Sequence, residues 1–171
     1  MIEVQIWRPM PPEQRLKGNV MKREGISQFQ IKQYQVLNFS LINTIVPPYE
    51  IQNVKIEHSF AREHEMKYDP AEKHWLGSLY IQYNANLPTQ VEEQKFCAEI
   101  GIVGLFEYDA DDTDKQKDIF ENLIRLNGTV SLLAIMRGIV AASTSALGFR
   151  PGLIMPSINL NKFEWDKVKR E

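Results

Sequence analysis

The first candidates for metal or proton chemistry are three histidines: His58, His64 and His74. An imidazole can bind a transition metal or transfer a proton near neutral pH. The histidines lie in or beside predicted strands, at spacings that match no zinc motif. His58 also falls on the apolar side of its predicted strand, where a hydrogen-bonded structural histidine is commoner than a metal ligand. We therefore predict no metal site from these residues.

Cys97 is the only cysteine and hence the only candidate thiol nucleophile. A nucleophilic thiol needs a neighbouring base or cation that lowers its pKa, and no histidine is near Cys97 in the sequence. It follows Phe96 in a predicted strand, on the face opposite the core. We interpret it as a structural or incidental thiol. A single cysteine excludes an internal disulfide and a multi-cysteine zinc site, and it suits a reducing compartment.

Two further segments could bind ions. The first is a group of four acidic residues: Asp109, Asp111, Asp112 and Asp114. A calcium loop would need glycine at its sixth position and an acid at its twelfth, which is Phe120, so we interpret the group as a solvated turn and helix N-terminus. The second is the glycine-bearing segment 148–152, in which Pro151 lacks the N–H that a phosphate cradle would use. We find no set of residues for an enzyme or a cofactor.

Composition indicates an ordinary globular domain. The chain has 171 residues, 43% hydrophobic and 25% charged, which is enough for a real core. The net charge of −2 gives no basic field for nucleic acid. The first residues lack a signal peptide's cationic start and apolar segment, so we expect a cytoplasmic protein. Residues 1–28 are predicted to be an N-terminal arm or extension, and residues 29–171 the folded domain.

Alternating apolar residues predict four strands, at about 29–41, 54–61, 77–87 and 93–108. Short polar turns join them, which favours an antiparallel sheet with one wet face. In the first strand the alternation shifts near Val36 and Leu37, which indicates a β-bulge.

Two helices are predicted after the sheet, at 115–126 and 129–147, separated by Asn127 and Gly128. Asn127 or Thr129 could cap the second helix. This second helix is apolar nearly all round and long enough to span a membrane. Arg137 in its middle and several Ser and Thr residues argue against insertion, so we expect burial in protein.

The second helix also carries small residues on one side, which would let two helix backbones approach closely. We predict an oligomer interface at four of them: Gly138, Ala141, Ala142 and Ser145. The alternative is that one large domain covers both sides of the helix.

Two segments resemble the SecB family of protein-export chaperones. Residues 148–160 read GFRPGLIMPSINL, similar to the family's pattern of glycine, apolar residues and two prolines. Residues 96–101, with Gly104, are similar to its fourth strand. The resemblance implies an α+β fold with a four-stranded antiparallel sheet, a long helix, a proline-bearing crossing loop and a short C-terminal helix. It also implies assembly as a dimer of dimers.

The resemblance further implies a holdase that binds unfolded client polypeptides in apolar grooves without ATP. The clients would be either preproteins for export or a dedicated antitoxin of a toxin–antitoxin–chaperone system. The groove residues would be apolar and adaptable, and we expect them to be Ile42, Val46, Phe149, Leu153, Ile154 and Met155. The alternative for each is ordinary core packing.

The chain departs from the family pattern in three places. The tail that docks on the SecA motor is missing, and the acidic residues that the family's sheet presents to SecA have no match. Residues 1–28 have no counterpart either. These departures leave general export and a single antitoxin client both open, and they put SecA docking in doubt. A protein of a different class, an oligomeric assembly protein without chaperone activity, is the alternative.

Overall fold

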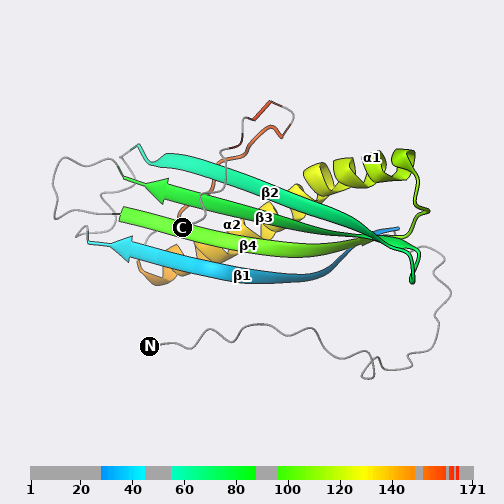
Figure 1. Cartoon of the computed structure of the whole chain (residues 1–171). Helices are drawn as coiled ribbons and strands as arrows, with labels where there is room; N and C mark the ends of the chain where they lie inside the picture. Colours follow the sequence, from blue (N-terminus) through cyan, green and yellow to red (C-terminus); the bar gives the residue numbers. More distant parts are fainter. Residues whose placement is uncertain are drawn as a thin grey trace, which may run out of the picture.

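Four antiparallel strands form one twisted sheet in the order β1-β4-β3-β2 (Figure 1). The computed structural model describes residues 28–44, 55–87, 96–148, 152–160, 162–163 and 165. The strands are β1 (Phe29–Asn43), β2 (Glu57–Asp69), β3 (His74–Asn86) and β4 (Phe96–Tyr108). The predicted antiparallel sheet is confirmed. The second strand runs further than expected, because the polar residues 62–69 pair with β3 as far as Asp69 and His74.

β1 and β2 are the two edges of the sheet. Pairing of β1 with β4 shifts register twice, between Ile31 and Gln33 and between Val36 and Asn38. The second shift is the predicted bulge. An extra residue at each shift bends the strand and restores the alternation of its side chains.

The two faces of the sheet differ. On the helix face, β3 and β4 contribute alternate fully buried residues such as Leu79, Ile81, Ile100 and Ile102. The opposite face, called the outer face below, carries the partly exposed residues between them. The core therefore lies on one side of the sheet only, as expected for an antiparallel sheet with one wet face.

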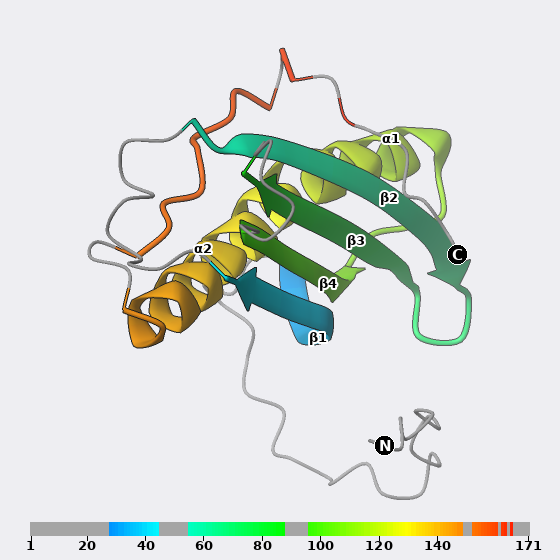
Figure 2. The same ribbon diagram turned by 90° about the vertical axis from the view of Figure 1, so that its left-hand side faces the viewer.

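One continuous helix crosses the helix face (Figure 2). It consists of α1 (Asp114–Leu123), the π-helical turn η3 (Ile124–Gly128) and α2 (Thr129–Ala146). Thr113 caps its start, since the Thr113 hydroxyl oxygen accepts from the Gln116 backbone N–H at 3.3 Å. The four aspartates thus precede or begin a helix, as predicted.

The predicted break at Asn127 and Gly128 is wrong, because the chain passes through both in helical conformation. Gly128 is buried against the sheet, and a Cβ there would lie 3.1 Å from the Phe106 ring. A glycine at this position therefore allows close packing and does not end the helix. Neither Asn127 nor Thr129 acts as a cap.

Arg62 of β2 stabilises the π-helical turn. The Thr129 backbone N–H donates to the carbonyl oxygens of Ile124 and Leu126, and not to that of Arg125 as it would in a regular α-helix. The Arg62 guanidinium donates to the Arg125 carbonyl oxygen instead, at 3.0 Å. The guanidinium carbon of Arg62, Cζ, also lies 4.5 Å from the centre of the Trp165 ring. Arg62 therefore joins β2, the helix and the C-terminal segment.

After α2 the chain returns over the β2 side of the sheet (Figure 2). Phe163 and Trp165 both pack on Phe60 of β2, with ring centres 5.6 and 6.3 Å away. In residues 152–160, 162–163 and 165 the backbone forms a turn at Asn159 but no helix. The short C-terminal helix that the resemblance implied is thus not found in these residues, and residues 166–171 lie outside the described part of the chain.

We predict that Arg62→Met lowers the free energy of unfolding by about 1 to 2 kcal/mol. The Arg125 carbonyl would lose its charged donor, and Trp165 would lose its cation. Urea denaturation followed by circular dichroism measures the change. Lys67→Met is the matched control, since Lys67 lies on the same strand but is exposed on the outer face. Equal stability of the two variants would contradict this role of Arg62.

Candidate functional site

The crossing segment after α2 is fixed to the end of that helix through Thr144. The buried Thr144 hydroxyl donates to the Val140 carbonyl oxygen at 2.7 Å and accepts from the Leu153 backbone N–H at 2.7 Å. Gly152 lies so close to the helix that a Cβ would clash with the Ala141 carbonyl oxygen. Arg137 of α2 donates to the Pro156 carbonyl oxygen at 3.3 Å. This hydrogen bond fixes the crossing segment to the helix at a second point, after Leu153. The segment therefore has a defined path although it lacks regular structure.

This path separates the predicted groove residues of the crossing. Met155 is only 3% exposed and belongs to the hydrophobic core, and Leu153 packs partly buried against that core. Ile154 between them is 72% exposed. The ordinary-packing alternative therefore holds for Met155, because alternate side chains of an extended segment point to opposite sides. Ile154 is the crossing residue that presents apolar surface.

Ile42 also presents apolar surface, at the end of β1. It pairs with Cys97 and lies on the outer face, about half exposed. β1 and α2 end at the same side of the molecule, so Ile42 and the crossing segment belong to one end of the fold (Figure 1). The remaining two predicted groove residues, Val46 and Phe149, lie outside the described residues.

A larger apolar surface along β1 was missed by sequence reasoning. We call it the β1 margin, and its residues are between 41% and 56% exposed: Ile31, Leu37, Phe39 and Ile42. Ile31 and Phe39 lie on the helix face, where they pair with Phe106 and Ile100 of β4. Both remain exposed, because the helix does not cover them. The signal was present, since β1 is rich in apolar residues. Its exposure could not be predicted without knowing that β1 is an edge.

The side of the helix turned away from the sheet is also open. Its first half presents the large residues Leu126 and Val130, and its second half presents Gly138, Ala142 and Ser145. A Cβ on Gly138 would meet nothing within 4 Å, so nothing in the described protomer requires glycine there. By length and composition alone this helix could cross a membrane, and 39% of its apolar window is buried. Of the predicted interface residues, Ala141 is the more buried and the other three lie on the open side.

Within the part of the chain that the structure describes, the polar groups show no arrangement for acid–base or nucleophilic chemistry. Burial raises the pKa of the Tyr83 hydroxyl, which lies 2.9 Å from the Nδ1 atom of His58, so that the tyrosine stays protonated. Burial lowers the pKa of His58. Burial and the Glu99 carboxylate raise the pKa of the Cys97 thiol, which keeps it protonated and unreactive. His58 and Cys97 therefore fit the structural roles predicted for them.

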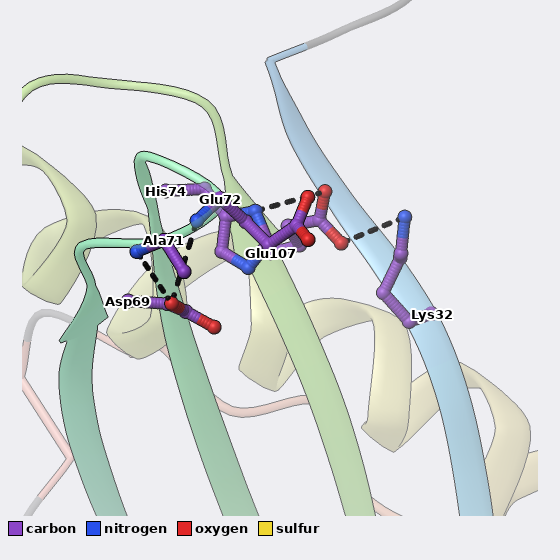
Figure 3. A network of polar contacts seen from close by, with 6 residues as sticks. All are labelled: Lys32, Asp69, Ala71, Glu72, His74 and Glu107. Carbon is purple, nitrogen blue, oxygen red and sulfur yellow. Dashed lines mark hydrogen bonds and ion pairs between the residues drawn. The ribbon is translucent and has the colours of Figure 1, made fainter. Parts of the chain in front are cut away.

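One group of side chains has the composition of a metal site. Possible ligand atoms of His74, Glu107 and Asp109 lie within 4.8 Å of one another. Glu107 already contacts two partners: Lys32 Nζ at 2.7 Å and His74 Nδ1 at 3.7 Å (Figure 3). A cation would have to displace the Lys32 ammonium group, and we assign no metal to this group.

Comparison with known proteins identifies the fold. No protein-family model matches the chain, and no curated protein sequence matches it. Among solved structures it is similar to the Mycobacterium tuberculosis SecB-like chaperone Rv1957, which was solved in complex with a ChAD peptide from the Rv1956 HigA1 antitoxin. The TM-score is 0.50 at 18% sequence identity, over 77% of this chain and 91% of that one.

A protein of unknown function from Streptococcus agalactiae is also similar, with a TM-score of 0.46 at 16% identity, over 75% of this chain and 97% of that one. The first similarity establishes the architecture, and the resemblance to SecB is confirmed at that level: the chain has the SecB-like α+β fold.

We predict that Thr144→Val loosens the crossing segment. Valine has the same shape but cannot accept the Leu153 N–H, and an unpaired buried donor costs about 1 to 3 kcal/mol. Amide hydrogen exchange at Leu153 should accelerate roughly tenfold or more, because each 1.4 kcal/mol is a factor of ten. Ser131→Ala is the control, since the Ser131 hydroxyl donates only to the preceding turn of its own helix. Unchanged exchange at Leu153 would show that Thr144 does not hold the segment.

Proposed function

We propose that this protein is an ATP-independent molecular chaperone, a holdase that binds unfolded client polypeptides on exposed apolar surface. The observation that carries the proposal is the β1 margin. Four large apolar side chains lie there on an edge strand, and the crossing segment presents a fifth, Ile154. Large apolar groups that stay exposed next to each other mark interaction sites on proteins.

The chemistry of an edge strand suits a client of variable sequence. The backbone N–H and C=O groups of an extended polypeptide are the same whatever its side chains, and an edge strand can pair with them. The apolar residues of β1 then add contacts that do not depend on one particular client sequence. Full burial of a side chain such as Phe or Ile contributes about 1.5 to 3 kcal/mol. Two or three such contacts are enough for useful binding of an unfolded chain.

Two kinds of client remain: preproteins for export and a dedicated antitoxin. The SecB-like chaperone of similar fold was solved with an antitoxin peptide. This similarity favours the antitoxin client. Proteins that co-purify with this one distinguish the two, since a single small partner indicates a dedicated client and many precursors indicate export.

We further propose that the open side of the helix joins copies of the chain into the dimer of dimers of SecB. The surface contains Leu126 and Val130 at one end and the small residues Gly138, Ala142 and Ser145 at the other. In an antiparallel helix pair the large residues of one copy would pack against the small residues of the next. Such pairing would explain a glycine that meets no neighbour in the protomer.

The alternative function is an assembly protein that uses the helix only to bind its own copies. The β1 margin argues against it, because the margin is apolar and exposed on a different part of the surface. The test is suppression of aggregation of a chemically unfolded protein. A chaperone suppresses it at near-stoichiometric amounts, whereas an assembly protein does not.

We predict that the double variant Phe39→Ser and Ile154→Ser weakens binding of an unfolded client roughly tenfold or more, about 1.4 kcal/mol. Its melting temperature should change little, because both side chains are exposed. Fluorescence anisotropy with a labelled, permanently unfolded protein measures the affinity. Ile119→Ser is the control, since Ile119 is an exposed isoleucine on α1, away from the proposed surface.

Met155→Ser should lower stability and leave client binding intact, because Met155 is buried in the core. We expect a loss of roughly 2 to 5 kcal/mol of stability, and unchanged client affinity well below the melting temperature. Client binding by the double variant that equals wild type would contradict the proposed surface.

We predict that Ala142→Glu breaks the oligomer into smaller species, because it places an unpaired charge against the partner helix. Light scattering gives the mass, and circular dichroism should show the sheet intact. Ala71→Glu is the control, since Ala71 lies in the exposed turn between β2 and β3. A wild-type protein that is monomeric at micromolar concentration would contradict the assembly outright.

A further inference from the structure

We propose that the segment preceding β1, residues 1–27, binds the outer face of the sheet of its own chain, with its apolar residues in a groove across β3, β4 and β1. The inference does not depend on chaperone activity, because this groove lies on the face opposite the helix.

The groove consists of two adjoining hollows that share Leu105. The larger, of about 590 Å³, lies over the neighbouring ends of β2, β3 and β4, and Leu76 and Ser78 contribute to it. The smaller, of about 180 Å³, extends to β1 past Val103. Leu105 lines both hollows, with Leu76 in the larger one and Val103 in the smaller, so that apolar side chains run from one hollow into the other. A groove of this shape fits an extended segment that crosses the strands.

The larger hollow is lined by Glu65 and Glu107 together with Lys32 and Lys67, and over the outer face as a whole the carboxylates outnumber the lysines. By the alternation of the strands, six acidic residues and two lysines point to the outer face: Glu57, Glu63, Glu65, Asp69, Glu99 and Glu107, with Lys32 and Lys67. Lys32 is held by Glu107 at 2.7 Å (Figure 3). The acidic excess lies mainly along β2. A ligand that combines apolar and basic residues would complement the face.

Residues 1–27 have this combination. Ile2, Val4 and Ile6 alternate with polar residues, which places three apolar side chains on one side of an extended chain. Five basic residues and three acidic ones occur in the segment, giving it a charge opposite to that of the outer face. The basic residues follow the apolar group, at Arg8, Arg15, Lys17, Lys22 and Arg23.

The point of attachment favours binding within one chain. The segment joins β1 at Phe29, which pairs with Tyr108 at the same end of the sheet as the larger hollow. Residues 7 to 28 can span up to about 70 Å, far more than the groove requires. Attachment within one chain gives the segment an effective concentration of roughly millimolar order at the groove. Even a contact with a dissociation constant of about 0.1 mM would therefore be mostly occupied.

Disulfide trapping tests the proposal. In a Cys97→Ser background, we pair Val4→Cys with Ser78→Cys in the larger hollow. As control, we pair Val4→Cys with Asn122→Cys, an exposed position on α1 on the other side of the sheet. Under mild oxidation the first pair should form an intramolecular disulfide at least tenfold faster than the control pair. Circular dichroism verifies that each variant is folded.

Charge reversal adds a second measurement. Glu63→Lys with Glu65→Lys should slow trapping of the first pair several-fold and leave the control pair unchanged. Equal trapping rates for the two pairs would overturn the proposal. So would a disulfide that forms only between chains when the Val4→Cys and Ser78→Cys proteins are mixed, since the occupant would then be a second copy.

Discussion

Close packing of the helix on the sheet determines the rest of the structure. Gly77 of β3 lies under Ile124 and Phe120, and Gly104 of β4 lies under Leu132, so that these helix side chains pack directly on the strand backbone. The π-helical turn falls at the same place and lets Gly128 approach Phe106. Arg62 then satisfies the carbonyl group that this turn leaves without its usual donor. The contact is specific because each of these positions tolerates little added volume.

A single helix cannot cover a four-stranded sheet. A helix with its side chains is about 10 Å wide, whereas neighbouring strands are about 4.8 Å apart, so that one helix covers about two strands. Here it covers β3 and β4, and the returning segment covers β2 through Phe163 and Trp165. β1 is covered only in part: Phe29, Val36 and Leu41 pack against the core, but Ile31, Leu37, Phe39 and Ile42 remain exposed. The surface proposed for clients is thus a geometric consequence of the fold.

The same geometry leaves two other surfaces with different properties. Along α2 the open side of the helix carries small and apolar residues and no exposed charge, which suits a second copy of the same helix. The outer face combines a narrow apolar groove with an excess of carboxylates, which suits a partly basic segment. The open side of the helix and the outer face lie on opposite sides of the sheet, so self-association and a bound N-terminal segment need not compete.

The sequence by itself determined the strands and the antiparallel sheet, because period-two alternation and short polar turns are local signals. It also indicated the bulge at Val36 and Leu37, the helix start after the acidic turn, and the structural roles of His58 and Cys97. Tertiary structure decided the rest. Asn127 and Gly128 look like a break locally, but packing against Phe106 keeps them helical. Met155 and its neighbour Ile154 differ in exposure only because Thr144 and Gly152 fix the path of the crossing segment. β1 is an edge only because the strand order β1-β4-β3-β2 places it at the end of the sheet. Such contacts join residues far apart in the chain, which no local pattern records.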